Sequence, residues 1–142
     1  MKDSREQPKL IDTINFTTDK LFLEDCADRI NFPINIGQCN IYVYSNEGTI
    51  PHFHIIPKNG IGESCICIYE PLYFNHGGKQ LRLNSKQRKI LNNWLSSPNE
   101  KLNSVTNWDI VALSFDNANE TNFYNKEAKQ PNYSNMNSYK GG

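Results

Sequence analysis

The middle of the chain shows the clearest alternation of hydrophobic and polar positions, which is the pattern of half-buried β-strands. β-Branched and aromatic residues fill positions 40–45, and apolar residues alternate with polar ones over positions 51–57 and 63–70. Residues typical of turns separate these runs, namely Asn46-Glu47-Gly48 and Asn59-Gly60. The pattern therefore predicts a three-stranded antiparallel meander.

The Asn59-Gly60 dipeptide predicts the register of the second hairpin, because it favours a two-residue type I′ turn. With these residues at the turn, positions whose numbers sum to 119 face each other across the two strands. One face of the hairpin then carries His52, His54, Cys65 and Cys67. The other face is apolar and carries Phe53, Ile55, Ile66 and Ile68. Gly62 leaves a bulged loop open as an alternative.

A helix is predicted to begin after residue 83. The segment Asn84-Ser85-Lys86-Gln87 resembles a capping box, in which the first and last side chains satisfy backbone N–H groups. Pro98 is expected to end the helix. Its apolar residues follow the three- and four-residue spacing of one helix face, namely Ile90, Leu91, Trp94 and Leu95. We expect this face to cover the apolar side of the sheet, since an isolated meander is barely stable in water.

Three more runs complete the expected fold. Residues 10–16 alternate moderately and predict a first strand, whereas residues 21–27 fit either a short helix or a strand. The apolar run over residues 108–115 predicts a last strand. The expected fold class is α+β, with a small antiparallel β-meander of three to five strands covered by one main helix.

The length of 142 residues fits one domain, and the composition indicates where that domain ends. Asparagine, which favours turns and caps, occurs 20 times, and seven of these residues follow position 116. We therefore expect a flexible leader over residues 1–8, a single α+β domain over 9–116, and an Asn-rich tail over 117–142 that is extended or disordered.

Charge and hydropathy exclude several classes of protein. Fifteen basic and fifteen acidic residues give a formal net charge of zero, which argues against a general nucleic-acid coat protein. No apolar run approaches the ~18 residues of a membrane span, and the first residues lack the apolar core of a secretion signal. We therefore expect a cytoplasmic protein whose four cysteines are reduced.

The histidine-bearing face is the strongest candidate for chemistry. His52 and His54 lie two apart on a strand, so both side chains project from one face with backbones about 6.6 Å apart. With Cys65 and Cys67 opposite, the four side chains would form a Cys2His2 set of the kind that zinc prefers. The alternative is that the thiols and imidazoles only pack within the fold, without a metal or any other cofactor.

The same histidines, with His76 as a third, are candidates for general acid–base catalysis because imidazole titrates near neutrality. A phosphate ester would also need a cationic clamp. The only candidate is the stretch 77–89, whose five basic residues are Lys79, Arg82, Lys86, Arg88 and Lys89. Basic residues at the start of a helix oppose its dipole, so a solvent-exposed helix face is the alternative interpretation.

The segment from Ile41 to Ile55, with Pro51-His52-Phe53-His54 at its centre, resembles a small bacterial family, the domain of unknown function 4160. The helix from Leu83 to Trp94 matches the later helix of that family, and the resemblance covers roughly residues 38–108. Members often occur beside other short genes in settings that look like toxin–antitoxin or mobile-element modules. The resemblance therefore implies an accessory or regulatory binding protein and implies no chemistry.

Two functions follow as hypotheses. The first is a non-enzymatic domain of a bacterial or phage accessory module, which binds a protein partner rather than a nucleic acid or a membrane. Exposed aromatic residues and the Asn-rich tail could become ordered on such a partner. The second is a His-dependent nuclease or phosphoesterase, with or without a metal such as zinc.

Overall fold

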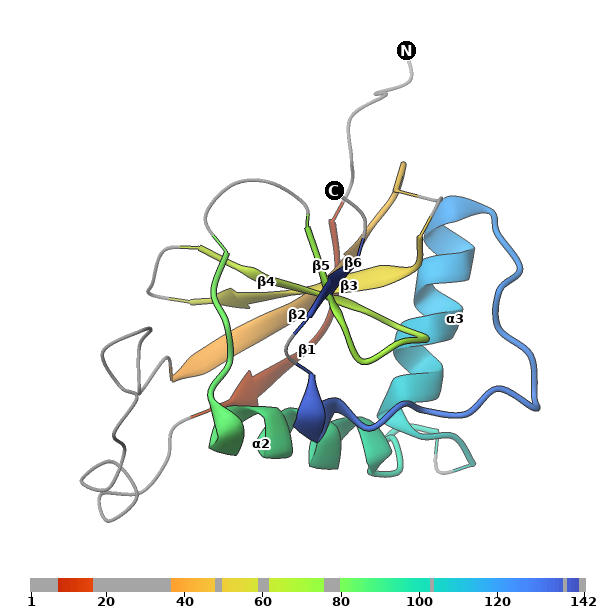
Figure 1. The fold of residues 1–142 in the computed structure, drawn as a ribbon. Coiled ribbons are helices and arrows are strands. Elements are labelled where there is room, and N and C mark those ends of the chain that lie inside the picture. The colour runs from red at the N-terminus through yellow and green to blue at the C-terminus, as the bar shows by residue number, and fades with distance from the viewer. Residues whose placement is uncertain are drawn as a thin grey trace.

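The computed structural model describes residues 8–16, 37–47, 50–58, 62–75, 80–102, 104–136 and 138–140. In these ranges six strands form one sheet in the order of the sequence (Figure 1). The strands are β1 (Pro8–Asn15), β2 (Gln38–Tyr44), β3 (His52–Pro57), β4 (Ser64–Cys67), β5 (Tyr73–Phe74) and β6 (Tyr139–Lys140). Neighbouring strands from β1 to β5 are antiparallel, whereas β6 runs parallel to β5. The predicted α+β class with a small meander is confirmed.

The register predicted for the histidine hairpin is confirmed by the pairing of β3 with β4. His52 lies opposite Cys67, and His54 lies opposite Cys65. Phe53 pairs with Ile66 and belongs to the hydrophobic core. The turn residues 59–61 lie outside the described residues, as do the runs 1–7 and 21–27. The predicted first strand corresponds to β1, which begins at Pro8.

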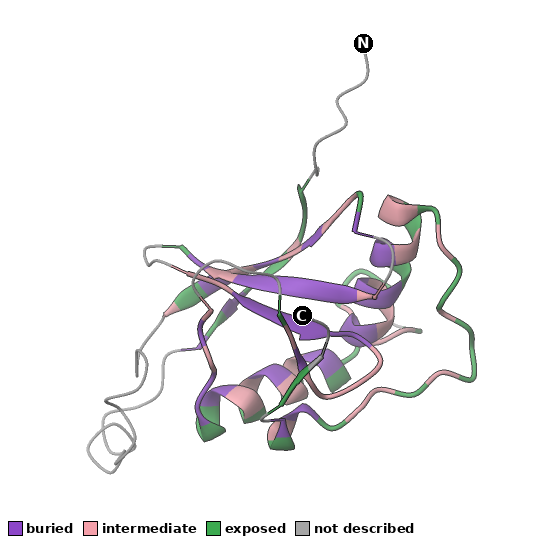
Figure 2. Ribbon diagram, turned by 45° about the horizontal axis from the view of Figure 1, so that its top comes forward, coloured by how far each residue is buried: buried purple, intermediate pink, exposed green. Residues whose placement is uncertain are grey.

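Helix α2 (Ser85–Ser96) confirms the predicted helix and its cap. The Asn84 side chain accepts a hydrogen bond from the Gln87 backbone N–H, and the Gln87 side chain accepts one from the Asn84 N–H, both at 2.8 Å. Leu91 and Leu95 are fully buried against the sheet. Figure 2 shows α2 with its buried side turned toward the sheet.

The strand predicted over residues 108–115 is wrong, because this segment lies in helix α3 (Asn107–Asn119). The Thr106 hydroxyl accepts a hydrogen bond from the Asp109 N–H, and the Asp109 carboxylate accepts one from the Thr106 N–H, which starts the helix. The buried residues follow helical spacing, namely Trp108, Val111, Ala112 and Phe115. The sheet is therefore covered by two helices rather than one.

The segment after residue 116 was expected to be a separate tail, but the structure packs it into the domain. Tyr133, in the short 3-10 helix η2 (Tyr133–Asn135), is fully buried, and Met136 is 1% exposed. The Tyr133 hydroxyl lies 2.6 Å from the carbonyl oxygen of Ile68, which also accepts a hydrogen bond from the Trp108 indole at 3.0 Å. The boundary placed at residue 116 is thus too early, because the core continues through Met136.

None of the helices in the described ranges has the length and apolar character needed to cross a membrane.

Candidate functional site

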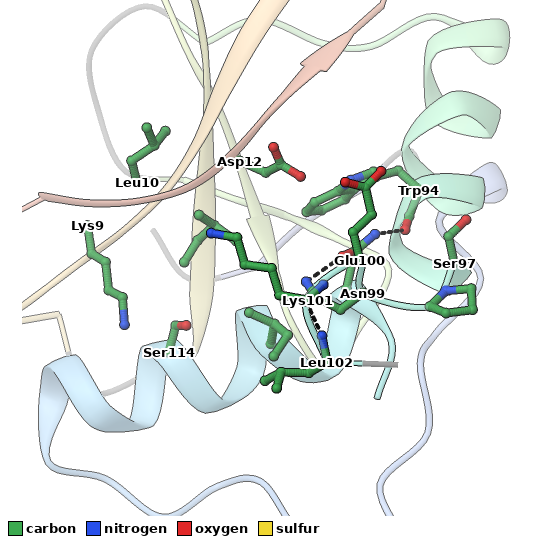
Figure 3. Close-up of a pocket in the computed structure, with 14 residues that line it drawn as sticks. Lys9, Leu10, Asp12, Trp94, Ser97, Asn99, Glu100, Lys101, Leu102 and Ser114 are labelled. Atoms are coloured by element: carbon green, nitrogen blue, oxygen red, sulfur yellow. Dashed lines mark hydrogen bonds between the residues drawn. The ribbon is translucent and has the colours of Figure 1, made fainter. Parts of the chain in front are cut away.

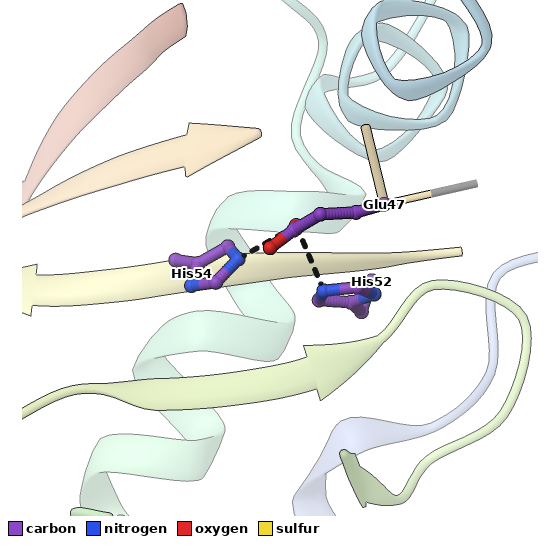
Figure 4. A group of neighbouring side chains, drawn as sticks. All are labelled: Glu47, His52 and His54. Atoms are coloured by element: carbon purple, nitrogen blue, oxygen red, sulfur yellow. Dashed lines mark hydrogen bonds and ion pairs between the residues drawn. The ribbon is translucent and has the colours of Figure 1, made fainter. Parts of the chain in front are cut away.

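A glutamate and two histidines meet on one face of the sheet (Figure 4). The Glu47 Oε1 atom lies 2.9 Å from His52 Nε2 and 3.0 Å from His54 Nε2. The side chains of both histidines are 2% exposed, and that of Glu47 is 3% exposed. The three side chains therefore interact away from solvent, where electrostatic interactions are stronger than at the surface.

Two local features bring these residues together. His52 and His54 lie two residues apart on β3, so their rings project from the same face, with centroids 5.2 Å apart. Glu47 lies in the loop after β2, and Asn119 at the end of α3 holds this loop. The Asn119 side chain accepts a hydrogen bond from the Glu47 N–H at 2.7 Å and donates one to the Tyr44 carbonyl at 2.9 Å.

The second ring nitrogen of His52 is oriented by the backbone. His52 Nδ1 lies 2.7 Å from the carbonyl oxygen of Ile50. Because a carbonyl oxygen can only accept, Nδ1 carries the proton of this hydrogen bond, and Nε2 lies on the side of Glu47. The ring also stacks on Phe74 with centroids 4.3 Å apart. The orientation of the imidazole is thus fixed on both sides.

His54 contacts acidic groups through both nitrogens, since Nδ1 lies 3.1 Å from Glu63 Oε1 and 3.3 Å from Cys65 Sγ. Burial lowers the pKa of His54, but hydrogen bonds to Cys65, Glu47 and Glu63 outweigh this effect and raise the pKa to about 12. For Glu47, burial raises the pKa, and the contacts with His52 and His54 bring it well below its ordinary value. Without a bound ion, the pair of Glu47 and His54 is therefore charged near neutral pH.

The residues that can hold a metal in the structure differ from the four ligands predicted from the sequence. Two groups of described residues bring donor atoms within 4.8 Å of one another and can hold a metal, namely Glu47-His52-His54 and His54-Glu63-Cys65. The predicted set of His52, His54, Cys65 and Cys67 is divided, because His52 belongs to the first group, Cys65 to the second, and only His54 to both. Cys67 belongs to neither group.

Neither carboxylate was among the site residues predicted from the sequence. Glu47 was assigned to a turn and Glu63 to the start of a strand, and no local pattern marks either of them as a partner of the histidines. The available signal was the position of each glutamate: Glu47 lies in the turn that precedes His52-x-His54, and Glu63 lies beside Ser64, which pairs with Ile55.

The described cysteines are buried and form no disulfide, namely Cys39, Cys65 and Cys67. Burial raises the pKa of the Cys39 thiol to about 12 and also raises that of Cys65, where the His54 contact opposes the effect only in part. Because the thiolate is the reactive form, we expect all three to react with iodoacetamide at pH 8 at least tenfold more slowly in the native protein than in urea. Peptide mass spectrometry measures this, and equal rates in the two states would contradict it.

Arg82 and Arg88 of the predicted cationic clamp make contacts within the domain. Arg88 donates hydrogen bonds to the carbonyls of Leu83 (2.8 Å) and Ser134 (3.0 Å), so it ties the C-terminal segment to the start of α2. The Arg82 guanidinium lies over two aromatic rings, 5.1 Å from the centroid of each. Lys86 and Lys89 are exposed on α2, and His76 and Lys79 lie outside the described residues. Arg82 and Arg88 thus have structural roles within the domain.

A groove of about 510 Å³ lies apart from the histidines, between β1, the end of α2, the loop 97–102 and α3 (Figure 3). Leu10 and Leu102 line it and are 53% and 56% exposed. Charged side chains of both signs also line the groove, namely Lys9, Asp12, Glu100 and Lys101. The groove shares no residue with the histidine cluster.

Comparisons with models of protein families, with curated proteins and with solved structures found no match.

Proposed function

We propose that this chain is a non-enzymatic accessory domain that binds an extended segment of a partner protein in the groove beside β1. The observation that carries the proposal is the exposure of Leu10 and Leu102, each more than half accessible, in one groove. Apolar side chains with charges of both signs around them resemble the apolar centre and polar rim of protein interfaces. Binding of a partner segment would remove both leucines from water.

The shape of β1 favours a different protein over a second copy of this chain. β1 is the first strand of the sheet, and its pairing with β2 shifts register between Leu10 and Asp12. A bulge with charged neighbours such as Lys9 discourages regular edge-to-edge pairing of identical strands. A segment of a different protein can instead place apolar side chains against Leu10 and Leu102. It does not need to pair with β1 as an additional strand.

The histidine cluster supports a non-enzymatic role. His52 and His54 are each 2% exposed, and both lie against the Glu47 carboxylate, so their rings present almost no surface to a nucleic acid or other large phosphate ester. Arg88, which a phosphate clamp would need, already binds two backbone carbonyls. These contacts disfavour the His-dependent nuclease or phosphoesterase as an alternative.

The setting of the protein is part of the proposal. The resemblance of residues 38–108 to the domain of unknown function 4160 family suggests a cytoplasmic accessory protein of a phage, mobile-element or toxin–antitoxin-like module. The first partners to test are therefore the products of the neighbouring genes.

Leu102→Asp and Leu10→Asp are expected to weaken partner binding at least tenfold, because each places a charge in the apolar part of the groove. The tagged chain is co-expressed with each neighbouring gene product, and the affinity of any complex is measured by calorimetry. Leu113→Asp is the matched control, since Leu113 is 42% exposed on α3 but does not line the groove.

Equal affinities for all three variants would refute the groove as the binding site. Hydrolysis of RNA or of a phosphate ester that disappears in a folded His54→Ala variant would instead establish the enzymatic alternative. Self-association of the chain that Leu102→Asp abolishes would assign the groove to a second copy.

A further inference from the structure

We infer that Glu47, His52 and His54 form a site for one divalent transition-metal ion of the zinc type. This inference is independent of the proposed partner groove. It rests on the approach of three donor atoms, Glu47 Oε1 and the two Nε2 atoms, which all lie within 4.8 Å of one another. Two imidazoles and one carboxylate are a donor set that zinc accepts in proteins, commonly with a water molecule as the fourth ligand.

The spacing of the donors suits an ion. Zinc lies about 2.0–2.2 Å from nitrogen and oxygen ligands, so two neighbouring ligands are roughly 3.0–3.5 Å apart for angles between 90° and tetrahedral. The Glu47 oxygen lies 2.9 Å and 3.0 Å from the two Nε2 atoms. These two distances are close to the separation of neighbouring ligands around one zinc ion.

The Nδ1 contacts of the two histidines also support a metal site at their Nε2 atoms. His52 Nδ1 contacts the Ile50 carbonyl at 2.7 Å, and His54 Nδ1 contacts the Glu63 carboxylate at 3.1 Å. Metal-binding histidines typically donate their second N–H to a carbonyl or a carboxylate, which fixes the ring and leaves the other nitrogen for the ion. Both histidines here have this arrangement, with both Nε2 atoms on the side of Glu47.

The contacts of His54 decide between the two possible donor groups. A site made of His54, Glu63 and Cys65 would use the Nδ1 side of the ring, and its Glu63 side chain is 26% exposed. The Glu47 site uses the Nε2 side and is formed by side chains that are 2–3% exposed. Glu63 and Cys65 then act as outer contacts that orient His54, and the ion would join the loop after β2 to strand β3.

The test uses the full chain, stripped with EDTA and titrated with Zn²⁺ by calorimetry and with Co²⁺ by absorption spectroscopy. We expect one equivalent of Zn²⁺ with a micromolar or lower Kd, a rise in Tm on binding, and visible d–d bands with Co²⁺. Glu47→Gln and His52→Gln are each expected to raise the Kd at least tenfold. Circular dichroism of the metal-free variants verifies that each one is folded.

Cys67→Ser and Glu127→Gln are the matched controls. Cys67 lies on the strand beside the histidines but outside both donor groups, and Glu127 is exposed. Unchanged affinity in these two variants, with loss in Glu47→Gln, supports the proposed ligands. The proposal is overturned if the wild-type chain binds neither ion, if binding persists in the double variant of Glu47→Gln and His52→Gln, or if Cys67→Ser removes binding and Glu47→Gln does not.

Discussion

A chain that ends at residue 116 is expected to lose cooperative folding. The truncation removes Tyr133 and Met136, which are 0% and 1% exposed in the core. Loss of a large buried side chain costs about 2–5 kcal/mol, and a small domain is stable by only about 5–15 kcal/mol. The removal of both side chains therefore approaches the whole stability of the domain. Thermal denaturation followed by near-ultraviolet circular dichroism measures the effect.

A chain that ends at residue 136 provides the control, because it lacks β6 but keeps Tyr133 and Met136. We expect it to unfold cooperatively at a reduced Tm. Tyr133→Phe removes the hydroxyl and keeps the ring, so it measures the contribution of the hydroxyl alone. It should lower the free energy of unfolding by about 1–2 kcal/mol, because the Ile68 and Cys67 carbonyls lose one hydrogen-bond donor. A sigmoidal transition of the 1–116 chain at the Tm of the full chain would refute the role assigned to the C-terminal segment.

Glu47→Ala is expected to lower the free energy of unfolding by about 3 kcal/mol in the metal-free protein, because removal of one member of a buried ion pair leaves the other uncompensated. The effect is greatest near pH 6. The lowered pKa of Glu47 makes its contribution fully present above the ordinary value of 4.5. The raised pKa of His54 makes its contribution fully present below 6.5, with loss as the pH rises toward about 12.

Urea denaturation at pH 6 in the presence of EDTA measures this change. Glu127→Ala is the control, since this exposed glutamate should alter stability by less than about 0.5 kcal/mol. An equal, small change in both variants would mean that Glu47 does not compensate a buried charge.

The parts of the fold that the sequence predicted correctly depend on local signals. The Asn59-Gly60 turn and the alternation along the hairpin together predicted that His54 pairs with Cys65, and the cap at Asn84 and Gln87 predicted the start of α2. For residues 108–115 the continuous apolar run was interpreted as a strand. The apolar residues there also have helical spacing, and the cap formed by Thr106 and Asp109 was the signal that distinguished the two.

The remaining features depend on contacts between distant parts of the chain. Glu47 reaches the histidines because Asn119, at the far end of α3, holds its loop. Tyr133 is buried in the core, and its hydroxyl donates a hydrogen bond to the Ile68 carbonyl. Neither partner is near in sequence, so polarity alone placed Glu47 in a turn and Tyr133 in a tail. The histidine half of the site was predictable, whereas its carboxylate half required the tertiary structure.

The parallel pairing of β6 with β5 also determines when the protein can finish folding during synthesis. Tyr73 pairs with Tyr139, so β5 has no partner on that side until residue 139 has emerged from the ribosome. At typical elongation rates this interval is on the order of several seconds. During that time the nascent sheet exposes the Tyr73 edge and the carbonyl of Ile68 that Tyr133 later contacts.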